Sequence, residues 1–169
     1  MADFNQAFSK TMNNEGGYAL TNIPGDAGGQ TYAGISRVAN SGWSGWAYVD
    51  RGETPPTQLV RDFYKANYWD RFQGDQVSSQ AVAENIYDFS VNAGTSVAIK
   101  LAQTVVKVEA DGVVGQASLA ALNAPDIDDA FGAFYAVAKL SRYAEICNRN
   151  RDQSKFLLGW VNRILKGLK

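Results

Sequence analysis

The sequence predicts a mainly α-helical fold in which a small turn- and β-rich lobe lines a cleft beside a helical body. From Thr57 to the end of the chain, apolar residues recur at helical spacing between short stops at Gly, Asn and Pro. Residues 19–56 are instead rich in Gly, Thr, Ser, Pro and Asn and lack a long helical period. A chain of 169 residues that is 46% hydrophobic and has no flexible linker suits one compact body.

An N-terminal helix is predicted over residues 3–13, where Asp3 is a suitable N-cap and Gly16-Gly17 ends the helix. Its apolar residues share one face: Phe4, Ala7, Phe8 and Met12. In the lobe that follows, residues 24–26 predict a turn and residues 31–36 a short strand. A glycine-rich loop there has two aromatic anchors, Trp43 and Trp46.

The C-terminal two thirds predict a series of helices joined by short loops. They are expected from Thr57 through Tyr68, then over 79–93, 95–107, 116–122 and 126–150, with a last helix capped by Asp152. Each carries an apolar stripe, which in the helix over 95–107 consists of Val97, Leu101 and Val105. The loop around Asp111-Gly112 connects two of these helices.

Composition excludes several classes of active site. The chain has no histidine, so a Ser-His-Asp triad, a Cys-His pair and a His-based zinc site are all impossible. The single cysteine, Cys147, allows no disulfide framework and suits a packed thiol. Hydrolysis would therefore depend on other side chains, and paired carboxylates are the commonest remaining solution, as in glycoside cleavage.

Charge and hydropathy bear on location and partners. No apolar run approaches the length of a membrane span, and no secretory signal is visible, so synthesis in the cytoplasm is expected. Residues 139–169 carry eight Lys and Arg against two Asp and Glu. This basic segment is equally consistent with a solvated helix face and with contact to an anionic outer membrane. No nucleic-acid-reading motif is present, so nucleic acid is not expected as a partner.

A carboxylate directly follows the predicted N-terminal helix, in the run Asn14-Glu15-Gly16-Gly17-Tyr18. The helix dipole disfavours a negative charge at this end, so Glu15 is placed to keep a proton and to act as a general acid. Asp26 lies eleven residues further on and is a candidate base for an attacking water, which Thr31 would position by a hydrogen bond. Asp26 is equally consistent with a turn-forming residue, and Thr31 with an ordinary strand residue.

The rings of Tyr18 and Tyr32 offer faces on which sugars stack, although core packing explains them as well. The glycines around them would let the backbone approach a sugar closely.

At these residues the sequence resembles glycoside hydrolase family 108, bacterial and phage N-acetylmuramidases of the lysozyme-like superfamily. Residues 15–18 resemble the family's E-G-G-Y signature, and residues 26–36 its D-P-G-G-x-T-x-x-G-I-S pattern, with Ala27 in place of the usual Pro. Residues 68–70 and 88–94 are similar to further landmarks of the family. The rest of the chain is similar to the predicted peptidoglycan-binding domain that often follows this hydrolase, although Ala117-Ser118 stands where a Thr is usual.

The resemblance implies a lysozyme-like muramidase domain over residues 1–93 and a helical peptidoglycan-binding-like region over 94–169, packed into the same body. It implies that Glu15 is essential and that Gln30 and Asn92, together with the two tyrosines, contact substrate. Asp26 and Thr31 follow only by positional analogy with more distant phage lysozymes, which use Glu, Asp and Thr in this order. No metal or organic cofactor is implied.

The function expected from this resemblance is cleavage of the β-1,4 bond between N-acetylmuramic acid and N-acetylglucosamine in peptidoglycan. If Asp26 assists an attacking water that Thr31 positions, the reaction is expected to invert the anomeric centre. The partner would be the glycan strand and the protein a monomer, an endolysin released to the cell wall through a holin pore. Three alternatives stay open: a lytic transglycosylase that uses Glu15 alone, a non-catalytic peptidoglycan-binding protein, and a membrane-disrupting protein.

Overall fold

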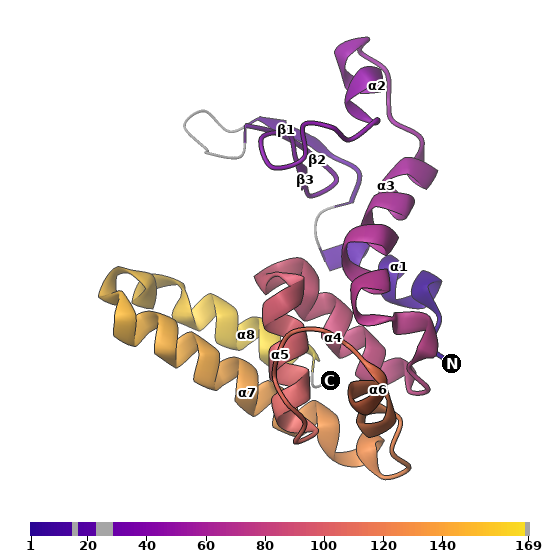
Figure 1. Cartoon of the computed structure of the whole chain (residues 1–169). Helices are drawn as coiled ribbons and strands as arrows, with labels where there is room; N and C mark the ends of the chain where they lie inside the picture. Colours follow the sequence, from indigo (N-terminus) through magenta and orange to yellow (C-terminus); the bar gives the residue numbers. More distant parts are fainter. Residues whose placement is uncertain (15–16, 23–28, 168–169) are drawn as a thin grey trace. The chain divides into compact units, whose positions relative to one another are not determined.

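The structure, a computed structural model, describes residues 1–14, 17–22 and 29–167. The chain divides into two compact units, one formed by residues 3–70 and the other by residues 71–169 together with Met1 and Ala2. Both contain several helices, and one small three-stranded sheet lies in the unit of residues 3–70 (Figure 1). The prediction of a mainly α fold with a small β-rich lobe is therefore confirmed.

The unit of residues 3–70, here called the N-terminal unit, combines helices with the sheet. Its elements are α1 (Phe4–Asn14), β1 (Leu20–Asn22), β2 (Gln30–Tyr32), β3 (Ile35–Ser36), α2 (Trp46–Asp50), α3 (Thr57–Tyr64) and the π-helical turn η1 (Lys65–Trp69). The side chain of Asp3 accepts a hydrogen bond from the backbone N–H of Asn5 at 2.7 Å, as expected of an N-cap. After α1, the N–H of Gly17, which has a positive φ of 75°, bonds to the carbonyl of Met12 at 3.0 Å, as is typical of the C-terminal end of a helix.

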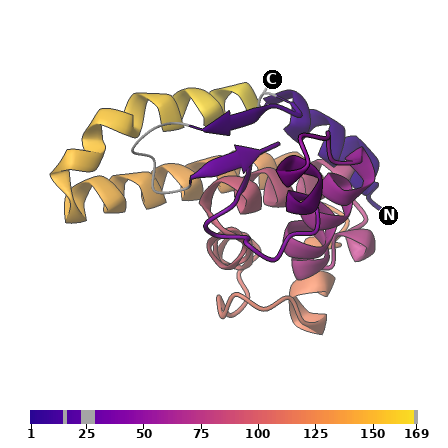
Figure 2. The same ribbon diagram turned by 90° about the horizontal axis from the view of Figure 1, so that it is seen from above.

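The sheet is antiparallel, in the order β1-β2-β3, and Figure 2 shows β1 and β2 running in opposite directions. Leu20 is paired with Tyr32 and Tyr32 with Ile35, which places an apolar row on one face. Thr31 is paired with Thr21 on one side and with Ser36 on the other, so the opposite face carries a row of three hydroxyls. The predicted turn at residues 24–26 lies outside the described residues.

The connection between β2 and β3 is a two-residue turn made by Ala33 and Gly34. Both residues have positive φ, 49° and 78°, as a type I′ hairpin turn requires. The hydroxyl of Tyr64 on α3 donates a hydrogen bond to the carbonyl of Ala33 at 2.9 Å. A Cβ on Gly34 would lie 2.5 Å from that hydroxyl, so glycine is needed both for its φ and for its size. The turn is thereby anchored to a helix of the same unit.

Aromatic side chains fill the core of the N-terminal unit. The predicted face of α1 is buried, with Phe4, Ala7, Phe8 and Met12 all at most 6% exposed. Phe4 lies 5.5 Å from Phe8 and 5.6 Å from Trp69 between ring centroids, and Phe8 meets Tyr64 edge to face at 5.7 Å. Such pairs add about 0.5–1.5 kcal/mol each beyond the apolar area they bury.

The other unit, here called the C-terminal unit, is entirely helical in its described residues. After the short 3₁₀ turns η2 (Asp70–Phe72), which spans the junction, and η3 (Gly74–Gln76), its helices are α4 (Gln80–Ala93), α5 (Thr95–Val105), α6 (Gln116–Leu122), α7 (Ile127–Arg149), η4 (Arg151–Phe156) and α8 (Leu157–Gly167). Helix α4 packs against α5 and α7, and α8 folds back along α7 (Figure 1). No helix in the described part of the chain has the length and apolarity to cross a membrane.

Two details of the C-terminal unit differ from the sequence predictions. The buried face of α5 is formed by Ala98, Ile99 and Ala102, whereas the predicted stripe through Val97 is only partly buried. Small alanines allow α5 to approach its neighbours closely, and the hydroxyl of Tyr135 on α7 reaches the carbonyl of Ala98 at 2.9 Å. The predicted cap of the last helix is also corrected, because Asn150 accepts the N–H of Asp152 and a 3₁₀ turn precedes α8.

A buried glutamine organises the loop between α5 and α6. Gln103 is 2% exposed, and its amide nitrogen donates to Asp111 Oδ1, to the carbonyl of Val113 and to Ser118 Oγ at 2.8–3.1 Å. Its amide oxygen accepts the N–H of Gly112 at 2.8 Å. The N–H of Val113 and the amide of Gln103 lower the pKa of the Asp111 carboxyl. The Asp111-Gly112 segment is thus a fixed loop closed by one side chain.

Candidate functional site

The two predicted carboxylates, Glu15 and Asp26, lie outside the described residues, but the elements on both sides of them are defined. Glu15 follows Asn14, the last residue of α1. Asp26 belongs to the segment between Asn22 and Gln30, which are directly paired in the sheet. The described part of the candidate site is therefore the end of α1 and the sheet.

Thr31, the predicted water-positioning residue, lies at the centre of the hydroxyl row. It is half-buried in the middle strand, between Thr21 and Ser36. The hydroxyl of Thr21 donates weakly to the Thr31 carbonyl at 3.4 Å, and Ser36 Oγ accepts the N–H of Ala39 at the same distance. The row presents hydroxyls, which both donate and accept, along one face of the sheet.

Gln30 and Tyr32 lie on the other face of β2, because side chains alternate along a strand. Tyr32 is 4% exposed, and its ring stacks on Trp43 with centroids 6.0 Å apart. Its ring therefore packs against protein and offers no open face to a sugar. Burial raises the pKa of the Tyr32 hydroxyl, with a smaller contribution from Tyr18, and this hydroxyl has no hydrogen-bond partner within the described ranges.

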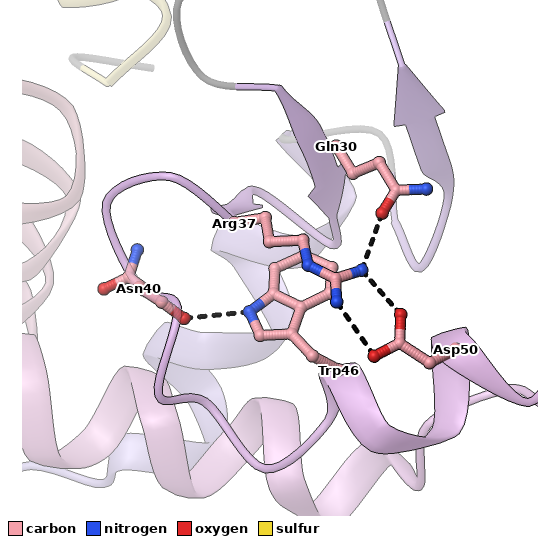
Figure 3. Close-up of polar contacts among 5 residues, drawn as sticks. All are labelled: Gln30, Arg37, Asn40, Trp46 and Asp50. Atoms are coloured by element: carbon pink, nitrogen blue, oxygen red, sulfur yellow. Dashed lines mark hydrogen bonds and ion pairs between the residues drawn. The ribbon is translucent and has the colours of Figure 1, made fainter.

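Arg37 fastens the middle strand to helix α2, as Figure 3 shows. One guanidinium nitrogen donates to Gln30 Oε1 at 2.8 Å and to Asp50 Oδ1 at 2.7 Å, and the other donates to Asp50 Oδ2 at 2.8 Å. The guanidinium lies 5.2 Å from the ring centroid of Trp46, whose indole N–H donates to the Asn40 carbonyl at 2.8 Å. The hydrogen bonds from Arg37 lower the pKa of the Asp50 carboxyl. Gln30 thus supports the sheet through its side-chain oxygen.

The remaining two predicted substrate residues are accessible but belong to different units. Tyr18, between α1 and β1, is 41% exposed. Asn92 is exposed near the end of α4 in the C-terminal unit, where its amide donates to the Asp88 carbonyl at 2.6 Å. The structure therefore brings Tyr18, Gln30, Thr31 and Tyr32 into one unit and places Asn92 in the other.

Asn92 lines a pocket of about 300 Å³ that is formed within the C-terminal unit by four helices. Helix α7 contributes Arg142 and Tyr143, and α8 contributes Trp160 and Arg163. The apolar side chains of Val97 and Ile146 also line the pocket. The pocket combines an aromatic wall with two guanidinium groups.

A buried lysine on α7 lies in the interior of the same unit. Lys139 on α7 is 7% exposed, and burial lowers its pKa from 10.5 to about 8, with Arg163 acting in the same direction and Asp88 opposing. Its ammonium group lies 4.6 Å from the Tyr135 ring centroid and 5.2 Å from that of Phe89, and it donates to Asn85 Oδ1 at 3.4 Å. These contacts hold a charge inside an otherwise apolar interior.

Among the residues with defined placement, no three Cys, Asp or Glu side chains gather to hold a metal ion.

Several residues of these sites could not be identified from a pattern in the sequence. Arg37 and Asp50 are thirteen positions apart on different elements, a spacing without a periodic signature. Arg142 and Tyr143 sit within a long helix and reach the pocket only because α7 packs beside α8. Trp46 is recognisable as an aromatic anchor, but no sequence pattern indicates that Arg37 is its cation partner.

Comparisons with known proteins agree with the resemblance. The family model described as Glycosyl hydrolase 108 matches residues 8–94, and the model described as Predicted Peptidoglycan domain matches residues 97–165. The solved structure of SagA from Brucella abortus matches with a TM-score of 0.74 and 27% identity, over 97% of this chain and 90% of the SagA chain. Comparison with curated protein sequences gave no match.

The two family matches and the two compact units divide the chain at different places. The matches meet between residues 94 and 97, whereas the units divide between residues 70 and 71. Helix α4 therefore belongs to the first match but packs with α5 and α7 from the second.

Proposed function

The chain belongs to the glycosyl hydrolase 108 family and is a peptidoglycan hydrolase, and we propose that it cleaves the β-1,4 bond between N-acetylmuramic acid and N-acetylglucosamine. The observation that carries this proposal is the family match over residues 8–94, because it spans Glu15 and the whole sheet. The match over residues 97–165 supports the same substrate.

Glu15 is the general acid in this proposal. It directly follows an 11-residue helix, whose C-terminal end carries a partial negative charge. That charge disfavours ionisation of the carboxyl and keeps a proton available for the leaving oxygen of the glycosidic bond. The chain has no histidine that could take this role instead.

Asp26 and Thr31 act on the water. Thr31 holds the water from the hydroxyl row, and Asp26 removes a proton from it as its oxygen attacks the anomeric carbon. The proton from Glu15 goes to the leaving O4 as the C1–O4 bond breaks, so protons and charges balance. Attack from the opposite face inverts the anomeric centre, a geometry in which the two carboxyl groups stand about 6.5–9.5 Å apart.

The test is digestion of purified sacculi by the wild type and by Glu15→Gln, followed by mass spectrometry of the released fragments. Loss of general-acid catalysis is expected to lower the rate by about 10²–10⁴-fold. Glu53→Gln is a matched control, because Glu53 is an exposed carboxylate of the same unit that pairs with Arg51. It is expected to digest sacculi at the wild-type rate.

The products separate the competing mechanisms. Reducing N-acetylmuramic acid ends support hydrolysis at the proposed bond, whereas anhydro-muramic ends would show a lytic transglycosylase. Asp26→Asn, with NMR of the newly formed anomer, tests the second carboxylate and the expected inversion. Undiminished digestion by Glu15→Gln would refute the assignment of the acid.

A further inference from the structure

The pocket of the C-terminal unit has a composition suited to an anionic ligand with an apolar or sugar face. Tyr143 and Trp160 stack at 4.7 Å with an interplanar angle of 22°, and they form one wall. Arg142 and Arg163 stand beside this wall on neighbouring helices. We propose that this pocket binds a carboxylate of the peptidoglycan stem peptide together with part of the adjoining muramic acid residue.

Arg142 has unused capacity to bind a carboxylate. Its only described ion pair, with Glu145, measures 3.7 Å and is longer than a hydrogen bond, and its side chain is 33% exposed. By contrast, the guanidinium of Arg37 is engaged by both oxygens of Asp50 at 2.7 and 2.8 Å. Arg142 can offer an incoming carboxylate the same two-bond arrangement, which is the strongest such contact an arginine makes.

Arg163 contributes a second positive charge. It pairs with Asp88 at 3.3 Å, and its side chain is 36% exposed. The buried Lys139 adds positive charge nearby, since its pKa shift depends on Arg163 and Asp88. The two arginines and the lysine are thus accompanied by two carboxylates, Asp88 and Glu145, among the described ion pairs, which leaves an excess of one positive charge. This excess favours an anionic ligand over a neutral one.

The aromatic wall and the volume narrow the class of ligand. A pocket of about 300 Å³ has the size of one sugar ring or a dipeptide. Trp160 stays partly exposed beside Val97, so the wall can receive the methyl and ring surfaces of a muramyl group. In peptide-bearing peptidoglycan the lactyl carboxyl of muramic acid is bound in an amide, so the free carboxylates are those of the stem peptide. The charge of the pocket therefore selects the stem peptide rather than the glycan.

The inference rests on the proposed function for its choice of peptidoglycan as ligand, but its site lies in the other compact unit from Glu15. It assigns substrate recognition to residues of α4, α5, α7 and α8. It also gives Asn92 a role in binding the peptide-bearing part of the polymer.

Binding is measured by calorimetry on the full-length chain carrying Glu15→Gln, so that cleavage does not interfere. The probes are N-acetylmuramyl-L-alanyl-D-glutamate, its diamide, which lacks both carboxylates, and N-acetylglucosamine tetramer. We expect the diamide to bind at least about tenfold more weakly than the acid, and Arg142→Gln to weaken binding of the acid by about the same factor. Arg149→Gln is the matched control, because Arg149 is an exposed arginine of α7 outside the pocket. It should change affinity less than about twofold.

Three results would overturn the proposal. One is equal binding of the acid and the diamide, and another is equal weakening by Arg142→Gln and Arg149→Gln. The third is Arg142-dependent binding to phosphatidylglycerol vesicles without muramyl peptide binding, which would assign the pocket to membrane lipid. Unfolding curves of the two variants control for folding, because both arginines are on the surface of α7. Anhydro-muramic products would refute the proposed cleavage without affecting this binding test.

Discussion

Replacing the buried lysine Lys139 by methionine is expected to stabilise the protein at neutral pH. Methionine keeps the length of the side chain and removes a charge that is 7% exposed in the interior of the C-terminal unit. A fall in pKa from 10.5 to about 8 means that folding disfavours the charged form by about 3 kcal/mol, at about 1.4 kcal/mol per pKa unit. Contacts of the ammonium with the rings of Tyr135 and Phe89 offset about 1–2 kcal/mol. We therefore expect a gain of about 1–2 kcal/mol at pH 7.

The pH dependence of this gain has a definite sign. Between pH 8 and 10.5 the unfolded lysine binds a proton that the folded one has lost, so the stability of the wild type rises with pH. The penalty is fully present below pH 8. The advantage of Lys139→Met should then shrink by about 2 kcal/mol between pH 7 and 9.5. Tyr135 and Tyr143, whose pKa values burial raises, are present in both proteins, so the comparison isolates the lysine.

The assay is denaturant unfolding of both proteins at several pH values between 7 and 9.5. Lys100→Met, at an exposed position on α5, is the control and should leave the pH profile unchanged. A loss of stability in Lys139→Met that is the same at every pH would refute the reasoning. It would show that the aromatic contacts and the hydrogen bond to Asn85 outweigh the cost of burying the charge.

Two further predictions concern residues that fix local structure. Gly34→Ala should destabilise the protein by about 2–4 kcal/mol, because Gly34 has a positive φ and a Cβ there would collide with the Tyr64 hydroxyl. Gly42→Ala, at a position with open space around it, should change the free energy of unfolding by less than about 0.5 kcal/mol. Thermal unfolding of both variants measures the difference. Gln103→Leu should cost about 2–3 kcal/mol, because it removes several part-buried hydrogen bonds that close the loop after α5. Gln116→Leu, at an exposed position, should not. Hydrogen exchange should then show the loop after α5 opening in the former variant alone.

The amphipathic helices were the part of the fold that could be predicted. Helix α1 buries its large apolar side chains on one face, and so does α4 with Val82, Ile86 and Phe89. The prediction failed for α5, whose buried face is built around two alanines. A pattern of large apolar residues cannot identify such a face, because the close helix contact that buries alanine depends on the partner helix.

The candidate chemistry was predictable by exclusion, whereas the supporting contacts were not. The absence of histidine directs any hydrolysis towards carboxylates, and this follows from composition alone. The contact of Arg37 with Gln30 and Asp50 depends on where β2 and α2 lie in space. The pocket around Arg142 likewise requires four helices to pack, including one that precedes Arg142 by about fifty residues.

The alternation of side chains along β2 separates the predicted water-positioning residue, Thr31, from two of the predicted substrate-binding residues, Gln30 and Tyr32. Neighbouring residues of a strand face opposite sides, so Gln30 and Tyr32 cannot share a surface with Thr31. Tyr32 is buried against Trp43 and Gln30 bonds to Arg37, so both hold the sheet on its packed face. Thr31 alone of the three belongs to the hydroxyl row. If substrate approaches this sheet, it meets the hydroxyl row, and the contribution of Gln30 and Tyr32 is to keep that row in place.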